Sequence, residues 1–283
     1  MSVLGPAVAG RWYPAHRAEL ISLVDGLLSA ADARSASPRG GSLAVIAPHA
    51  GLAYSGAVAA GAIRAIAGAG VDRLVVIGPS HHFAFAGAAV PSAAAAYRTP
   101  LGDLPIDADA VALLRRCHVV QASDRFFEPE HALEAELPFV QRSFPSPPAI
   151  VPVLCGPSLT EADAAQVAEA IAPLMDARTR LVVSSDFTHY GPRFDYVPFT
   201  DDLPARLEAL DRGAIRAIEA GDGAAFAGYV EATGATICGR RAIDVLLRLD
   251  VGRRGGRLAE YDTSGRITAS WDHSVSYASI GFP

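Results

Sequence analysis

Histidine and aspartate side chains follow three apolar stretches of this sequence, at the point where each stretch ends. His49 follows the first stretch, His81 and His82 follow the second, and Asp186 and His189 follow the third. Imidazole and carboxylate groups are the side chains that bind metals and transfer protons near neutral pH. One such histidine alone is usually an ordinary hydrogen-bonded loop residue, but three such motifs favour a functional site.

Two further residues could take part in the same chemistry. His131 either orients a metal ligand through a hydrogen bond or only forms a hydrogen bond at the start of a helix. Cys238 precedes a predicted helix that begins with Arg240 and Arg241. A helix N-terminus and nearby cations lower the pKa of a thiol, which favours a thiolate nucleophile or metal ligand. A buried and inert cysteine has the same sequence context.

The composition excludes several mechanisms and partners. Of the 283 residues, 24 are Arg and none is Lys or Asn, so a lysine Schiff base, a lysine general base and a P-loop lysine are all excluded. The formal net charge of -6, without an arginine-rich run, argues against nucleic-acid binding. The stretches 40–63 and 74–97 carry no charge, but they contain Pro, His and several Gly, so we expect no membrane span.

The cysteines predict a reducing environment. Cys117, Cys155 and Cys238 are odd in number and widely spaced, which argues against a disulfide framework. Residues 1–14 lack the basic and apolar regions of a signal peptide. We therefore expect a cytoplasmic protein with reduced thiols, in which Cys117 and Cys155 are packing residues.

Apolar runs alternate with helical patterns along the chain. Short β-branched runs predict strands over Leu43–Ala47, Arg73–Ile77, Ala149–Leu154, Arg180–Ser184, Leu258–Thr263 and Val275–Phe282. The last two suggest a hairpin across Asp272–Ser274. Helices are predicted over Arg17–Ala31, Ala57–Ala67, Asp107–Arg116, part of Pro129–Ser143 with a kink at Pro138, Thr160–Met175, Leu203–Ala220, Ala224–Ala232 and Gly239–Leu249. Thr160 and Asp163 have the spacing of a capping box at the start of the fifth of these helices. This order predicts one α/β domain over residues 1–283, with a central, mainly parallel sheet and helices on both faces.

This fold would position the chemically active residues. In an open α/β sheet, ligands bind in the crevice at the carboxyl ends of the parallel strands. His49, His81 and Asp186 all follow such ends, and His189 comes three residues after Asp186. We therefore expect these side chains to lie close together although they are far apart in the sequence.

A series of short motifs runs in order from about residue 5 to the C-terminus. The motifs are Gly10-Arg11-Trp12-Tyr13-Pro14, Pro48-His49-Ala50-Gly51 with Tyr54-Ser55-Gly56, Gly78-Pro79-Ser80-His81-His82, Glu130-His131 with Leu137-Pro138-Phe139, Ser184-Ser185-Asp186-Phe187-Thr188-His189-Tyr190-Gly191 and Cys238-Gly239. Together they resemble the Memo family, whose bacterial and archaeal members are called AmmeMemoRadiSam system protein B. Leu52 and Ala132 depart from the family pattern, which has an aromatic and a small hydroxyl residue there.

The resemblance implies a fold shared with class III extradiol dioxygenases, which are non-haem iron enzymes. It also implies a site at His49, His81 and Cys238 that holds iron or copper. Asp186 and His189 are expected beside it, either as an acid–base pair or as supporting residues in which the carboxylate fixes an imidazole tautomer. The cysteine stands where the dioxygenases have a carboxylate, and this departure argues against ring cleavage. Two imidazoles and one thiolate suit iron(II), copper or zinc and exclude magnesium and calcium.

Two supporting residues are expected beside this site. His82 is expected to contact substrate or to support a ligand by a hydrogen bond, and His131 to support a ligand in the same way.

Three classes of function remain open. The leading class is a metal-dependent, dioxygenase-like oxidoreductase that acts on an unknown small molecule. The second is a non-catalytic redox-active metal-binding protein or chaperone, whose partners the family name implies to be AMMECR1-type and radical SAM proteins. The third is a hydrolase with Cys238 as nucleophile, His189 as base and Asp186 orienting the base. A thiolate bound to metal could not also attack a substrate, so the third ranks last.

Overall fold

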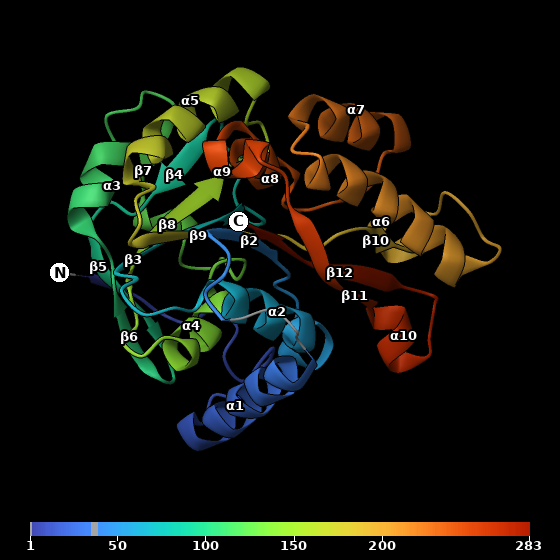
Figure 1. Cartoon of the computed structure of the whole chain (residues 1–283), viewed down its shortest axis with the longest axis horizontal. Coiled ribbons are helices and arrows are strands. Elements are labelled where there is room, and N and C mark those ends of the chain that lie inside the picture. The colour runs from blue at the N-terminus through green and yellow to red at the C-terminus, as the bar shows by residue number, and fades with distance from the viewer. Residues whose placement is uncertain (1, 35–38) are drawn as a thin grey trace.

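A nine-stranded sheet runs through the middle of the computed structural model, which describes residues 2–34 and 39–283 (Figure 1). Its strands, in their order across the sheet, are β10 (His189–Tyr190), β12 (Ser274–Phe282), β2 (Ala44–Ala47), β9 (Thr179–Ser184), β3 (Arg73–Pro79), β8 (Ala149–Cys155), β4 (Ala88–Val90) and β7 (Val120–Ala122), and β11 (Arg257–Thr263) also pairs with β12. A smaller sheet has the order β1 (Ser2–Leu4), β5 (Ala94–Thr99) and β6 (Gly102–Pro105).

The large sheet is parallel in its centre and antiparallel toward its edges. Strands β2, β9, β3 and β8 pair in parallel, whereas β12 pairs antiparallel with β2 and β4 pairs antiparallel with β8. The predicted α/β class is therefore confirmed, and the sheet is mixed. Strands β1, β4 to β7 and β10 were not predicted, because they are short and several are rich in alanine, which carries little strand signal.

Helices cover both faces of the large sheet (Figure 1). On one face α8 packs on β3, β8 and β9, and α5 packs on α8; on the other, α2 packs on β2 and β12, and α1 packs on α2. The helices are α1 (Arg17–Arg34), α2 (Leu52–Ile66), α3 (Ala108–Leu114), α4 (Leu137–Ser143), α5 (Glu161–Ile171), α6 (Leu203–Glu219), α7 (Gly223–Thr233), α8 (Arg240–Arg248), α9 (Asp250–Arg253) and α10 (Ser264–Thr268). This layering confirms the prediction of helices on both faces.

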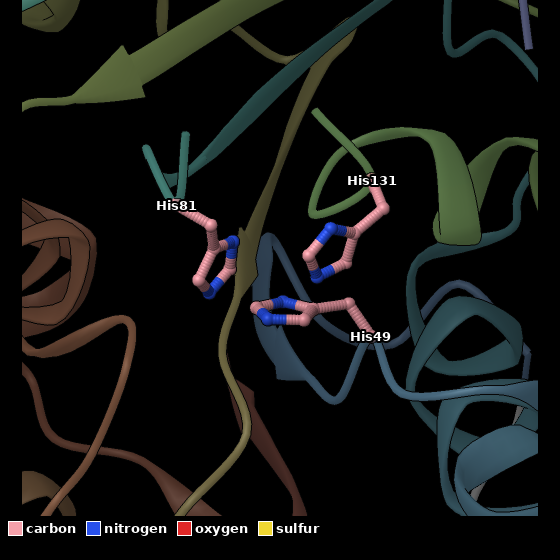
Figure 2. A group of neighbouring side chains, drawn as sticks. All are labelled: His49, His81 and His131. Atoms are coloured by element: carbon pink, nitrogen blue, oxygen red, sulfur yellow. The ribbon is translucent and has the colours of Figure 1, made fainter. Parts of the chain in front are cut away.

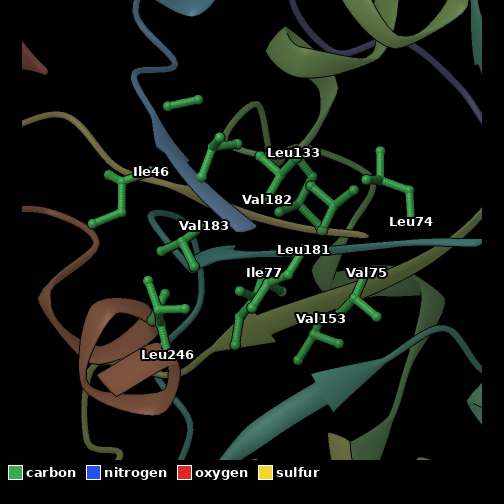
Figure 3. Close-up of a cluster of buried hydrophobic side chains, with 14 of the residues drawn as sticks. Ile46, Leu74, Val75, Ile77, Leu133, Val153, Leu181, Val182, Val183 and Leu246 are labelled. Carbon is green, nitrogen blue, oxygen red and sulfur yellow. The ribbon is translucent and has the colours of Figure 1, made fainter. Parts of the chain in front are cut away.

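The core lies between the central strands and the helices on each side. Figure 3 shows strand side chains such as Val75, Val182 and Val183 between Leu246 of α8 and Leu133. All five side chains are buried, and burying one of this size contributes roughly 1.5–3 kcal/mol. Because both faces of these strands are covered, they read in the sequence as continuous apolar runs. The packed core fixes the strand ends that carry the functional side chains.

Two local predictions had different outcomes. The predicted capping box at the start of α5 is confirmed, because Thr160 Oγ1 accepts from the Asp163 amide (3.1 Å) and Asp163 Oδ2 accepts from the Thr160 amide (2.9 Å). The predicted kink at Pro138 is wrong. Pro138 lies in the first turn of α4, where a missing N–H group breaks no helical hydrogen bond.

The predicted C-terminal strand pair is confirmed as the antiparallel pair β11 and β12. The connection between them contains α10 and is longer than the tight turn across 272–274 that the sequence suggested. Among the described residues, no helix is both long and apolar enough to cross a membrane.

Candidate metal centre

The carboxyl ends of β2, β9 and β3 meet at one edge of the sheet. The three strands are parallel and direct neighbours, with Ala47 paired to Ser184 and Val183 paired to Ile77. His49 follows β2, Asp186 follows β9 and His81 follows β3. The structure therefore brings together residues that are far apart in the sequence. The amide of His49 donates to Asp186 Oδ1 at 2.9 Å, although 137 positions separate the two residues.

Three imidazole rings converge at this edge. Figure 2 shows His49, His81 and His131 facing one another from three separate segments. One nitrogen from each ring lies within 4.8 Å of the other two. The rings of His81 and His131 stack with centroids 4.5 Å apart, and those of His49 and His81 are 5.3 Å apart. Three imidazole nitrogens in this arrangement can hold one transition-metal ion, so His131 offers a nitrogen directly and not only support for a ligand.

The buried carboxylate of Glu130 positions two of these rings. It accepts from the amide (2.6 Å) and from Nδ1 (2.9 Å) of His81, and from the backbone amides of His131 and Ala132, both at 2.9 Å. Burial raises the pKa of Glu130, but these hydrogen bonds outweigh it and hold the pKa below its ordinary value. The ionised carboxylate therefore fixes Nδ1 of His81 as a donor and leaves Nε2 free to bind a metal.

Ser184, the last residue of β9, fixes the ring of His49. The Ser184 hydroxyl donates to the carbonyl oxygen of Ala132 (2.5 Å), so its oxygen can accept from Nδ1 of His49 (2.8 Å). The lone pair of Nε2 of His49 then faces the site. Burial, and after it the charge of neighbouring imidazoles, lower the pKa of His49 well below its ordinary value. The ring is therefore neutral, as a metal ligand must be.

Behind Ser184 lies a second buried acid, Glu136. Its Oε1 is 3.3 Å from Ser184 Oγ, and its Oε2 is shielded from solvent with no hydrogen-bond partner among the described residues. Burial, and after it the charge of Asp186, raise the pKa of Glu136 well above its ordinary value. The raised pKa favours the protonated form of Glu136. Because the Ser184 hydrogen is directed to Ala132, the proton of Glu136 can complete the contact with Ser184.

Cys238 lies against His49 on the far side of that ring from Ser184. Its Sγ is 3.3 Å from Nε2 of His49 and accepts from the Asp186 amide at 3.2 Å. The following residue, Gly239, donates its amide to Ser185 Oγ (3.0 Å), and a Cβ at this position would overlap the Ser185 side chain. Glycine is therefore required for the start of α8 to approach β9 this closely, and this approach carries the thiol to the histidines.

The thiol of Cys238 has the opposite pKa shift from the one that its sequence context favours. Burial, and after it the negative charge of Asp186, raise the pKa of Cys238, and hydrogen bonds from backbone amides only partly offset this. The cations Arg240 and Arg241 do not reverse the effect. Without a bound cation Cys238 is a neutral thiol, and a metal ion is the partner that would stabilise its thiolate.

Asp186 and His189 both lie beside the site, but the carboxylate does not hold the imidazole. Asp186 accepts from the His49 amide, and burial raises its pKa against the opposing effect of His189. Nδ1 of His189 lies 3.0 Å from the carbonyl oxygens of Phe187 and Thr236. Nδ1 is therefore the protonated nitrogen of a neutral His189, and Nε2 is the atom that can exchange a proton.

His82 lies at the rim. Its side chain is exposed, and its ring centroid is 5.9 Å from that of His131. The other face of His131 meets Trp12, with ring centroids 4.2 Å apart. The N-terminal motif that contains Trp12 therefore lies beside this ring.

Comparisons with known proteins place nearly the whole chain in one family. The family described as Memo-like protein matches residues 5–281. This chain belongs to the Memo family. It is 36% identical to the protein memo-1 homolog of Caenorhabditis elegans over 96% of this chain and 80% of that protein. It is 33% identical to protein MEMO1 of Homo sapiens (95% and 94%) and 33% identical to a MEMO1 family protein of Methanopyrus kandleri (98% of each).

Three residues of this Memo-family chain position the histidines and were not predicted to do so. Glu130 and Ser184 lie inside recognised motifs, yet their types did not mark them as partners of a particular ring. Glu136 lies in a run of helical character, where an acid normally faces solvent. A buried acid within such a run has no local signature, so only the tertiary structure identifies it.

Proposed function

We propose that this Memo-family chain binds iron(II) or copper, with zinc as a third candidate, and acts as a dioxygenase-like oxidoreductase on a small molecule. The proposed ligands are His49, His81 and Cys238, and His131 lies among them. The observation that carries the proposal is the meeting of three imidazole nitrogens and one thiol at the carboxyl edge of the sheet. Sites of this kind in α/β sheets are where ligands bind.

The side chains present fit such a metal. Burial, and after it the charge of His81, lower the pKa of His131 to about 4, and His49 is lowered as well, so both rings are neutral near pH 7. Neutral imidazole and thiolate are ligands for iron, copper and zinc, whereas magnesium and calcium prefer oxygen ligands. The donor set therefore supports a transition metal.

The chain's own residues divide the remaining work. A bound iron or copper ion would supply the redox chemistry. Glu130 and Ser184 hold the rings of His81 and His49 in the orientation that presents Nε2. His189 presents Nε2 as a proton acceptor, because its Nδ1 is engaged with carbonyl oxygens. Asp186 accepts from the His49 amide and so holds the backbone of that ligand in place.

One observation favours a second, non-catalytic function. The side chain of His81 is 28% exposed, whereas that of His49 is buried, so a metal held between them is accessible from one side. A site of this kind suits a metal-binding protein that delivers or senses a metal in the cytoplasm. AMMECR1-type and radical SAM proteins are the proposed partners.

Hydrolysis by Cys238 has the least support. The raised pKa of this thiol disfavours a nucleophile, and Asp186 does not orient His189, which hydrogen-bonds to carbonyl oxygens instead.

The proposal is tested by metal analysis of protein purified without oxygen. We expect about one iron or copper ion per chain in the wild type, and loss of it in the double variant His49→Ala/His81→Ala. His16→Ala, which removes an exposed histidine outside the site, is the matched control and should keep its metal. Full occupancy in the double variant would rule out the site.

Oxygen consumption separates the two functions. The metal-loaded protein is incubated with a panel of small molecules that includes catechols. Uptake of oxygen that depends on the bound metal supports the oxidoreductase, whereas transfer of metal to a chelating acceptor without oxygen uptake supports the non-catalytic function.

A further inference from the structure

A pocket of about 370 Å³ opens directly beside the proposed metal ligands. His81 and Cys238 form part of its wall, and Arg240 and Arg241, the first two residues of α8, form another part. Its volume lies within the range of small-molecule binding pockets. The pocket therefore connects the proposed metal centre to a pair of cationic side chains.

The charged residues that line this pocket are all positive. Arg240 and Arg241 are the charged residues among those that line it, and no Asp or Glu is among them. Four other pockets in the described part of the chain each include an acidic residue. The chain as a whole carries a formal charge of -6, so this concentration of positive charge is opposite to the general charge of the protein.

Neither arginine forms an ion pair with an acid among the described residues, although the charge of Arg241 acts on Asp244. The nearest acid on the same helix, Asp244, pairs with Arg248 at 3.0 Å, and Glu161 also lies against Arg248. Nε of Arg241 is shielded from solvent and has no hydrogen-bond partner among the described residues. Two close cations with an unsatisfied buried donor form an arrangement that an anion would stabilise.

We propose that Arg240 and Arg241 bind the anionic group, a carboxylate or a phosphate, of a small-molecule substrate whose remaining part extends toward His81 and Cys238. This proposal names the substrate class and rests on the proposed function, because the bound molecule is a substrate only if the metal centre is catalytic. Guanidinium groups suit this task because their N–H groups form a fork that matches two oxygens of a carboxylate or phosphate. The arginines would then bind one end of the substrate, and the metal centre would face the other.

The test is anion binding by metal-free protein, measured by calorimetry at constant ionic strength with inorganic phosphate and acetate as separate probes. We expect saturable binding of at least one probe at one site. Arg240→Gln and Arg241→Gln should each weaken it by about tenfold or more. Arg116→Gln removes an exposed arginine elsewhere and should leave it unchanged. The stronger of the two probes identifies the group as phosphate or carboxylate.

Two further variants make the result decisive. Arg241→Lys keeps the charge but loses the fork, so it should bind more weakly than the wild type. Arg240 is exposed, so Arg240→Gln can be examined even if a variant at the half-buried Arg241 fails to fold. Absence of saturable binding to the wild type, or wild-type affinity in Arg240→Gln/Arg241→Gln, would overturn the proposal.

The metal content of each preparation is measured before its metal is removed for calorimetry, so the two proposals can fail separately. If the wild type holds metal but binds neither probe, the anion site is wrong and the metal centre stands. If the wild type binds a probe but holds no metal, the anion site stands and the proposed function is wrong.

Discussion

Sγ of Cys238 lies 3.3 Å from Nε2 of His49, although 189 positions separate the two residues in the chain. The contact depends on two short-range features. Ser184 fixes which nitrogen of His49 faces the thiol, and Gly239 lets the start of α8 approach β9. A soft sulfur and a neutral imidazole nitrogen in contact form half of a transition-metal site before any metal is added. The predictions below test each part of this arrangement.

Ser184→Ala should weaken metal binding by roughly 10- to 100-fold, because His49 loses the partner that orients its ring. The measurement is competition for metal against a chelator of known affinity. Ser143→Ala is the matched control, since the Ser143 hydroxyl is buried but has no hydrogen-bond partner among the described residues. Equal metal affinities in the two variants would show that Ser184 does not orient the ligand.

Glu136→Gln should stabilise the protein, and the gain should grow as the pH rises above about 4.5. Burial and the charge of Asp186 raise the folded-state pKa of Glu136 above its ordinary value of 4.5, so between the two values the folded chain keeps a proton that the unfolded chain releases. The stability of the wild type therefore falls with rising pH in that window, by up to about 1.4 kcal/mol per pH unit. Glutamine does not titrate. Denaturant unfolding of both proteins at pH 4, 5.5 and 7 measures the difference, and a constant difference would contradict the prediction.

Asp107→Asn is the control with the opposite sign. Burial raises the pKa of Asp107, but the Ala110 amide and the Arg73 guanidinium outweigh it and lower the pKa below 3.8. The stability contributed by this ionised carboxylate is present above the unfolded-state value and lost as the pH falls through the folded-state value. Asp107→Asn should therefore be less stable than the wild type at pH 6, and the difference should shrink as the pH is lowered through 3.8.

Gly239→Ala should destabilise the protein by about 1–3 kcal/mol, because the added Cβ overlaps Ser185 and forces α8 away from β9. Since Cys238 is the preceding residue, metal affinity should fall as well. Gly228→Ala within α7 is the control. Nothing lies within 4 Å of a Cβ there, so alanine should raise the free energy of unfolding by roughly 0.5–1 kcal/mol. Thermal unfolding and metal content of the two variants check both statements.

The sequence predicts the strands that carry this site better than the hydrogen bonds that orient its side chains. The central strands are buried on both faces, so their apolar runs are plain, and the residues that follow them must meet at one edge of a parallel sheet. The position of His49 beside His81 follows from that rule. The role of His131 does not, because it sits in an irregular segment whose path no periodicity describes.

The ring partners and the charge state of the thiol depend on tertiary packing. Ser184 contacts His49 because β9 pairs with β2, and Glu136 contacts Ser184 although the two residues are 48 positions apart. The pKa of Cys238 was expected to be lowered by the cations that follow it, but burial and the charge of Asp186 raise it. Local sequence contains the cations and cannot show the burial. Electrostatic predictions from sequence fail where desolvation dominates.

Cys238 and His131 are the two candidates for the third metal ligand. Four side chains at the site can bind a metal. One possible ligand set is His49, His81 and Cys238, and the other has His131 in place of Cys238. We expect Cys238→Ser to weaken copper binding by roughly 100-fold or more, since a hydroxyl does not replace a soft thiolate. His131→Ala should weaken it by roughly tenfold, because this ring stacks on His81 and supports it. Chelator competition without oxygen gives the affinities, and loss of the sulfur-to-copper absorption in Cys238→Ser identifies the thiolate as ligand. If His131→Ala lost its metal while Cys238→Ser retained it, the three histidines would be the ligands.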